Sequence, residues 1–413
     1  MATRRDGLAR RRAALGFTQE ALAERLGIER TTVGRWERGT MTPLPWNQPD
    51  LAKALNLSPE ALAEVLRTDG AGQLVHGPST PLISNELPNA TLGRLSLSED
   101  HGLGVVARIQ VTAQAFQTAD RRVGGGALYP SVVQYLNGEI GPRLLDPGVG
   151  INGSALFAAA ASMTEIAGWM SHDFGRDVLA HQYFDRAFRL ATAAHNQALA
   201  GNACASMAHL AIELDQADNA LRIATVGLET TRETAGSRRL IARLHSMRAR
   251  AFALRGERRS CTQELNAAER TLTGANNETA ADWIANFDDA SLASEAALCF
   301  LQLTQYREAE CQAREVIRLR SGDRVRSRAF GQLTLANVLL EAGRPDEAAM
   351  LGQEVCRSTT SLSSARVVQR LHDLGRSLAP ARSAPEVAAF LLALGALGHG
   401  PDGHEGRTIT WPV

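Results

Sequence analysis

Arginine, threonine and glutamine side chains recur at helical spacing in the stretch TQEALAERLGIERTTVGRWERG, residues 18–39. Arg30, Thr31 and Arg35 fall on the polar face of the helix predicted for residues 30–38. A guanidinium can donate two hydrogen bonds to guanine O6 and N7, and a threonine methyl group can pack on thymine. These residue types in this pattern therefore indicate contacts with base edges in duplex DNA.

Positive charge is concentrated at the start of the chain, although the formal charge of all 413 residues is zero. Residues 1–40 hold nine arginines and five acids, and nine minus five gives a net charge of +4. A basic end on a neutral chain predicts an anionic partner for that end alone. Arginines outside the base-reading face would contact phosphates, which position a protein on DNA without reading its sequence. These candidates are Arg4, Arg5, Arg10, Arg11 and Arg38.

Residues for enzymatic chemistry lack the required spacing. The glycines at 124–126 have no Lys and Ser/Thr of a phosphate-binding loop after them, and no histidine pair has the helical spacing of metal ligands. No serine or cysteine lies in a nucleophile motif. We therefore expect neither catalysis nor a bound metal or cofactor.

The cysteines and the hydropathy pattern predict a cytoplasmic protein. All five cysteines fall in apolar helical patterns, which predicts buried free thiols in a reducing compartment. No apolar run approaches the roughly 18 residues of a membrane span, and the N-terminus lacks the apolar core of a signal peptide. The cysteines are Cys204, Cys261, Cys299, Cys311 and Cys356.

Short helices must hold the base-reading side chains in place. Thr18 can cap a helix whose first turn is Gln19 and Glu20. Farther along, Ser58 can cap a helix that begins with Pro59, because proline is well tolerated in a first turn. These signals place helix starts on both sides of the base-reading segment.

Apolar residues at helical spacing predict a single core for this part of the chain. Gly27 permits the left-handed backbone of a sharp turn between two helices. Val33 and Trp36 face inward after that turn, and Leu8 and Leu15 face inward before it. With two helices from the stretch DLAKALNLSPEALAEVL, the pattern predicts a five-helix domain.

The caps, the apolar spacing and the ending WERG together resemble the XRE-type helix-turn-helix domain of phage repressors and their bacterial relatives. The resemblance covers residues 5–68 and implies that Gln19 holds a backbone phosphate. It also implies an ion pair between Arg12 and Glu37 that braces the recognition helix. The DNA-binding residues assigned on this basis are Gln19, Arg30, Thr31, Thr32, Arg35, Arg38, Arg4 and Arg5.

Gly34 departs from the pattern of these relatives. We expect it at an outward position, where glycine removes a possible base contact and costs about 1 kcal/mol of helix propensity. One recognition helix also provides little surface for tight binding. We therefore expect a homodimer on an inverted-repeat operator with half-sites about one helical turn apart.

Composition divides the chain into four segments. The helix-turn-helix domain occupies residues 1–68, and glycines and prolines among polar residues predict a flexible linker at 69–102. Helical spacing returns over 103–397, followed by a glycine-rich tail at 398–413. Almost nothing reads as strand, so the predicted class is all-α.

The long helical segment repeats a template of small residues. A small residue on a first helix is followed after twelve positions by a residue on a second helix, then after four and three more, which predicts closely packed antiparallel helix pairs. Glycines end several first helices, and Pro345 begins a second helix. The five sets are Gly168, Ala180, Phe184 and Ala187; Ala208, Ala220, Ala224 and Gly227; Ala249, Cys261, Leu265 and Ala268; Ala297, Ala309, Ala313 and Val316; and Ala336, Ala348, Gly352 and Val355.

This template resembles the tetratricopeptide repeat over about residues 155–358, with a longer period than is usual in that family. Helix pairs off the template at 104–138 and 363–397 are expected to be end caps. The resemblance implies a concave groove lined by first helices, with ligand contacts from Trp169, His172, Asp173, Asn202, His209, Arg243, Arg250 and Asn337.

A repressor-like domain joined to such an array is also similar to the peptide-responsive regulators of bacteria. That similarity implies a transcription regulator in which a ligand in the groove changes the array or the dimer interface. A signalling peptide, a partner protein and a small molecule all remain open as ligands, and dimerisation alone is a further possibility. The competing hypothesis is a scaffold or adaptor with an accessory DNA-binding head, in a plasmid, phage or antitoxin role.

Overall fold

Helices are the only regular elements among the residues that the computed structural model describes, which confirms the all-α class. Two compact units are distinguished, one of Met1–Glu99 with Asn137–Leu145 and one of Asp100–Leu136 with Asp146–Val413. No helix of the described residues is long and apolar enough to cross a membrane. The described residues are 6–26, 28, 30–39, 43, 47–66, 104–123, 125–145, 153–232, 234, 236–275, 287–320, 324–358 and 364–397.

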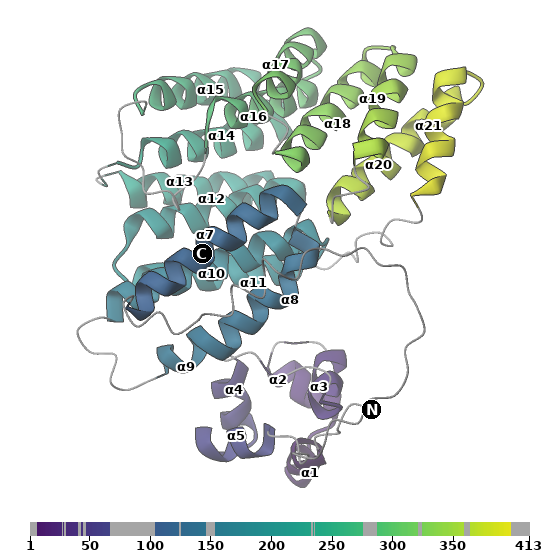
Figure 1. The fold of residues 1–413 in the computed structure, drawn as a ribbon. Helices are drawn as coiled ribbons and strands as arrows, with labels where there is room; N and C mark the ends of the chain where they lie inside the picture. The colour runs from purple at the N-terminus through teal and green to yellow at the C-terminus, as the bar shows by residue number, and fades with distance from the viewer. Residues whose placement is uncertain are drawn as a thin grey trace. The chain divides into compact units, whose positions relative to one another are not determined.

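Five short helices close around one apolar core in the first unit, as the sequence predicts (Figure 1). Leu8, Leu22, Val33 and Trp36 are all at most 1% exposed. Leu15 was expected to face this core, but it is 37% exposed because α1 ends at Ala14 and the chain turns there. The helices are α1 (Asp6–Ala14), α2 (Gln19–Arg25), α3 (Arg30–Glu37), α4 (Asn47–Ala54) and α5 (Pro59–Leu66).

Side-chain caps fix two helix starts in this unit. The Thr18 hydroxyl accepts a hydrogen bond from the Ala21 amide at 3.0 Å, and the Ser58 hydroxyl accepts one from the Ala61 amide at 3.2 Å. Each cap satisfies an amide that has no partner within its helix. Both predicted caps are therefore confirmed, while the predicted turn residue Gly27 lies outside the described residues.

Antiparallel helix pairs stack on their neighbours through the second unit (Figure 1). The pairs that follow the template are α10 (Gly153–Asp173) with α11 (Asp177–Ala193), α12 (Gln197–Glu213) with α13 (Ala217–Thr231), α14 (Arg238–Leu254) with α15 (Arg258–Thr273), α16 (Asp289–Gln302) with α17 (Tyr306–Leu319), and α18 (Val325–Glu341) with α19 (Pro345–Ser358).

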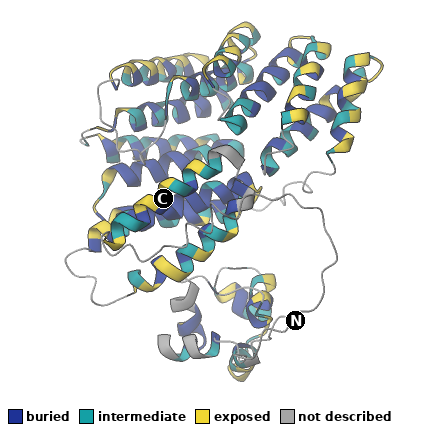
Figure 2. Ribbon diagram, viewed as in Figure 1, coloured by how far each residue is buried: buried dark blue, intermediate teal, exposed yellow. Residues whose placement is uncertain are grey.

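Every residue of the predicted template is buried, and Figure 2 shows the buried faces of the helices of the array in dark blue. Close approach explains the small residues. A Cβ atom added to Gly168 would lie 2.5 Å from Cε1 of Phe184, and one added to Gly352 would lie 2.6 Å from Cε2 of Phe390. The spacing of small residues along the chain therefore correctly predicted which positions pack between helices.

A left-handed residue ends the first helix of each template pair. Gly175, Gly256 and Gly343 have φ of 74°, 71° and 78°, in agreement with the predicted glycine stops. Asp215 and Thr304 take the same place in the second and fourth pairs, with φ of 55° and 57°. The sequence pattern missed these two turns because neither has the glycine that most often ends a helix in the left-handed conformation.

The helices expected to cap the array form, but α7 is not an end cap. Helix α7 (Val105–Val123) packs on α10 of the first pair and also on α18 of the fifth pair, and α8 (Gly125–Tyr135) packs on α10. At the other end, α20 (Ala365–Leu378) and α21 (Pro385–Ala396) pack on α18 and α19. Helix α7 therefore joins segments that lie far apart along the chain. Three short elements are also present. They are the π-helix η1 (Leu136–Ile140), the α-helix α9 (Gly141–Leu144) and the 3-10 helix η3 (Ala379–Ala381).

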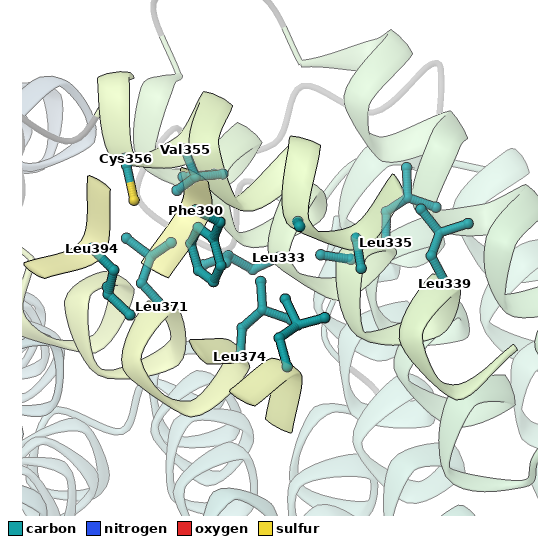
Figure 3. Close-up of a cluster of buried hydrophobic side chains, with 14 of the residues drawn as sticks. Leu333, Leu335, Leu339, Val355, Cys356, Leu371, Leu374, Phe390 and Leu394 are labelled. Atoms are coloured by element: carbon teal, nitrogen blue, oxygen red, sulfur yellow. The ribbon is translucent and has the colours of Figure 1, made fainter. Parts of the chain in front are cut away.

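The C-terminal part of the array has a continuous apolar core of its own. Leu333 and Leu335 of α18 belong to one buried cluster with Leu371 and Leu374 of α20 and with Phe390 of α21 (Figure 3). This packing explains why α20 and α21 are ordered helices although they lie off the repeat template.

One cysteine departs from the prediction of buried thiols. Cys311 is exposed, whereas the other four cysteines are buried and none of the five forms a disulfide. Cys311 lies on α17, where the buried residues Ala309, Ala313 and Val316 mark the inward stripe. Position 311 falls outside that stripe, so its side chain faces solvent.

Candidate nucleic-acid interface

The polar face of α3 carries the side chains expected to read DNA. Arg30, Thr31 and Arg35 are exposed, while Val33 and Trp36 on the opposite face are 0% exposed. Thr32, at the edge of the polar face, is half-buried, and Arg38 is exposed directly after the helix. Arg4 and Arg5 lie outside the described residues.

Gly34 is buried, which corrects the expectation that it faces outward. A Cβ atom at this position would lie 3.2 Å from Nη1 of Arg38 and 3.7 Å from Oε1 of Gln19. Glycine at position 34 therefore leaves room for two long polar side chains to cross the helix. Its small size serves packing between α2 and α3 and does not remove a base contact.

An ionic and hydrogen-bonded cluster of Arg12, Gln19 and Glu37 joins the first three helices. Nε of Arg12 donates to Oε1 of Glu37 at 2.5 Å, and Nη1 of Arg12 donates to the Phe17 carbonyl at 2.6 Å. Nε2 of Gln19 donates to Oε2 of Glu37 at 2.6 Å. Glu37 is only 6% exposed, and its buried charge is compensated by Arg12 of α1 and Gln19 of α2. The predicted brace between Arg12 and Glu37 is confirmed.

Gln19 is oriented at the start of α2 by this cluster. Its side chain is half-buried and borders a surface hollow that Arg12, Thr18 and Arg30 also line. A helix N-terminus beside two guanidinium groups is suited to an anion such as a backbone phosphate. The expected phosphate contact of Gln19 is compatible with this position.

Arg30 and Arg11 also contact other groups of the domain. Nη1 of Arg30 lies 3.3 Å from Oε1 of Glu20, and both side chains are more than 60% exposed, so this pair is weak and exchangeable. Arg11 donates to the carbonyls of Leu55 and Asn56 at 2.9 and 2.8 Å. Arg11 thus ties α1 to the end of α4, a structural role that the sequence did not indicate.

A short helix with two exposed arginines, braced by Arg12 through Glu37 and preceded by a capped helix, has the arrangement that places side chains in a major groove. Residues 8–62 match the helix-turn-helix family model. They form an XRE-type helix-turn-helix domain, and such a domain supports DNA-binding regulation in general. Searching the curated proteins gives no match for the chain.

Outside the helix-turn-helix domain, several residues expected to line a groove form a polar cluster inside the array. In this cluster, the Trp169 ring lies 5.1 Å from that of His209 and 5.9 Å from that of His172. The Arg243 guanidinium lies 5.5 Å from the Trp169 ring. The structure therefore brings together four of the predicted side chains from α10, α12 and α14.

Glu165 organises the polar side of this cluster, and sequence analysis missed it. Its carboxylate accepts hydrogen bonds from Nδ2 of Asn202 and Oγ of Ser206, each at 2.5 Å. Arg243 then donates to Oδ1 of Asn202 at 2.6 Å and to Ser206 at 3.1 Å. The predicted ligand contacts Asn202 and Arg243 are thus held by neighbouring groups of the chain itself.

Burial changes the protonation of the histidines in this cluster. Burial lowers the pKa of His209 well below its ordinary value, more than the Glu213 charge raises it. Burial and the Arg366 charge lower the pKa of His172, although Nδ1 of His172 lies 2.6 Å from Oδ1 of Asp177. Both rings are therefore neutral near pH 7.

Asp173 and Arg250 have separate charged partners. Arg250 contacts Glu295 at 2.8 Å and Glu213 at 3.6 Å, while Asp173 contacts Arg326 at 3.2 Å. Asn337, the last predicted groove residue, is half-buried on α18. Most of the predicted groove residues thus lie together in the interior of the array. Their charged partners were missed because those partners are distant in sequence.

Proposed function

We propose that this protein is a sequence-specific transcription regulator that binds double-stranded DNA through Arg30, Thr31, Thr32 and Arg35 of the recognition helix. The observation that carries the proposal is the exposed polar face of α3 together with the brace between Arg12 and Glu37. The brace restricts the orientation of the helix, and a fixed orientation is needed to read base edges. Gln19, Arg38, Arg4 and Arg5 would contact phosphates.

The regulator would act as a homodimer in the cytoplasm, where a bacterial chromosome lies. One recognition helix contacts few base pairs, so two helices on an inverted repeat are needed for tight and specific binding. The array, which makes up most of the chain, would provide the dimer interface. Its similarity to tetratricopeptide arrays, in residue spacing and in stacked helix pairs, supports this role.

The array would also sense a ligand through its interior polar residues. Trp169, Asn202, His209 and Arg243 lie together on three successive first helices, and first helices line the face that helical repeats offer to an extended peptide or partner protein. His172, Asp173, Arg250 and Asn337 extend the same set. A signalling peptide is the ligand class that the resemblance to peptide-responsive regulators favours.

Selection of genomic fragments bound by the full-length protein tests the proposal. We expect enriched fragments to share an inverted repeat with half-sites about one helical turn apart. Arg35→Ala should relax preference at one base pair of each half-site, by a factor of about 5 to 150. Lys53→Ala removes an exposed charge from α4 and is the matched control. It should leave the preference for each base pair unchanged.

Failure to enrich any fragment over random competitor at moderate ionic strength would exclude specific DNA binding. The scaffold hypothesis would then be favoured. Repeating the selection with a cell extract tests the sensing role, because a ligand should change the affinity for the same fragments without changing the sequence that they share.

A further inference from the structure

Two carboxylates end the first helices of the first two template pairs. Asp173 is the last residue of α10, and Glu213 is the last residue of α12. A helix C-terminus carries partial negative charge, so an acid there is unfavourable unless cations lie close to it. Both carboxylates receive those cations from helices that lie far along the chain.

Glu213 is contacted by three arginines. Arg366 donates a hydrogen bond to its Oε2, and Nη2 of Arg370 donates to the same atom at 3.0 Å, from helix α20. Arg250 of α14 approaches at 3.6 Å. Burial opposes ionisation of Glu213, but the charges of these arginines outweigh it and hold the pKa well below its ordinary value. The carboxylate is therefore charged and depends on α20.

The arginines of α20 are also held by an aromatic ring. The guanidinium groups of Arg366 and Arg370 lie 5.7 and 5.1 Å from the ring centroid of Phe330 on α18. Such cation–π contacts keep both side chains on one side of α20, directed at Glu213.

Asp173 connects the same two regions of the array. It accepts hydrogen bonds from the Gly125 amide at 3.1 Å, from Nη1 of Arg326 at 3.2 Å and from Oγ of Ser364 at 2.6 Å. Arg326 in turn forms a two-point contact with Asp120 of α7, at 2.8 and 2.6 Å. One polar node therefore joins α7 and α10 to the start of α18 and to the N-cap of α20.

Each side of this junction has an apolar core of its own. One buried cluster holds residues of α11 to α14, and another holds residues of α16 to α21. The contacts between α20 and α12 that carry the junction are ion pairs. Separating these ion pairs leaves the residues of each cluster packed with one another, so the junction can open while both cores stay intact.

We propose that the ion pairs of Glu213 with Arg366 and Arg370, and of Arg326 with Asp120 and Asp173, form a latch that closes the array on itself. In the closed state α20 lies against α12, and α18 lies against α7 and α10. In the open state the two cores move apart at the junction and α20 loses its contact with the first two pairs. The latch concerns the array alone and does not depend on DNA as the partner.

Hydrogen–deuterium exchange on the full-length protein tests the latch. Glu213→Gln removes the charge while keeping the shape, and leaves three guanidinium groups without their shared carboxylate. We expect amides of α20 and α7 to exchange about tenfold faster in this variant, because removing one partner of a buried charge pair strongly favours states in which the other is hydrated. Amides of α14 and α15 should keep their protection.

Glu264→Gln is the matched control. Glu264 is as buried as Glu213 (14% and 16% exposed side chains) but its partners, His245 and Arg248, lie within its own helix pair. This variant should leave exchange in α20 and α7 unchanged. The latch is supported if the amides of α20 and α7 exchange faster in Glu213→Gln but not in Glu264→Gln.

A second variant approaches the latch from the other side. The double substitution R366Q/R370Q removes the α20 charges and should give the same exchange pattern as Glu213→Gln, even if one of the two variants folds poorly. Unchanged protection of α20 and α7 in either folded variant would overturn the proposal, as would an equal increase in Glu264→Gln.

Discussion

Nε of Arg12 lies 2.5 Å from Oε1 of Glu37, which joins the last turn of α1 to the final residue of α3. The two side chains are 15% and 8% exposed, so neither charge is fully hydrated. Removing one partner of such a pair leaves the other charge buried without compensation. The brace therefore links the stability of the domain to the orientation of the helix.

Arg12→Ala should lower the free energy of unfolding of the helix-turn-helix domain by about 3 kcal/mol and weaken DNA binding. Amide exchange of α1 to α3 in the full-length protein, followed against denaturant, measures the first effect. Lys53→Ala, which removes an exposed charge from the same domain, should leave exchange unchanged. Equal protection in Arg12→Ala and Lys53→Ala would contradict the brace.

Glu20→Gln should increase affinity for operator DNA by about two- to fivefold. Glu20 pairs with Arg30 at 3.3 Å in the free protein, and both side chains are exposed, so DNA must compete with a weak contact. Titration of a labelled operator measures the change. Glu24→Gln removes a charge from an exposed position on the same helix. If Glu24→Gln gave the same increase, net charge and not the pair would be responsible.

Gly168→Ala should destabilise the array by about 1–3 kcal/mol. The added Cβ would lie 2.5 and 2.6 Å from two ring atoms of Phe184, which is 0% exposed and has little room to move. Gly395→Ala near the end of α21 meets no atom within 4 Å and serves as the control. Gly168→Ala should unfold at a lower temperature than Gly395→Ala. A Gly168→Ala variant as stable as the control would refute the close approach.

Stability of the array should fall as the pH drops below about 6.5. Burial lowers the pKa of His172 and of His209, so the unfolded chain binds more protons than the folded chain below the ordinary histidine pKa. The free energy of unfolding then decreases by up to about 1.4 kcal/mol per pH unit for each histidine. The pKa of Glu213 is shifted downward, so its contribution is present above its ordinary value and is lost only in more acidic solution.

His209→Gln should flatten this dependence between pH 7 and pH 5, measured as denaturant midpoints at each pH. His195→Asn changes an exposed histidine in a left-handed turn that asparagine tolerates, and should leave the slope unchanged. An identical slope for His209→Gln and the unsubstituted protein would show that this ring does not carry the effect.

Local sequence patterns predicted the helix caps and the buried positions of the repeat template. Thr18 and Ser58 cap helices as predicted because capping depends on a few consecutive residues. The template positions are buried as predicted because helical periodicity places every such residue on one face. The ion pair between Arg12 and Glu37 was predicted from the resemblance to a known domain, since relatives form an ion pair at these two positions.

The helices, their pairing and the exposed face of α3 could be predicted from the sequence, because they follow from periodicity and caps within a few turns of chain. Which small residues are enclosed and which charges meet depends on how the helices pack together. Gly34 is buried because α2 crosses it, and Glu213 meets Arg366 across 153 positions. Contacts between such distant residues leave no periodic signal, since each is set by how the packed pairs bring the chain back on itself.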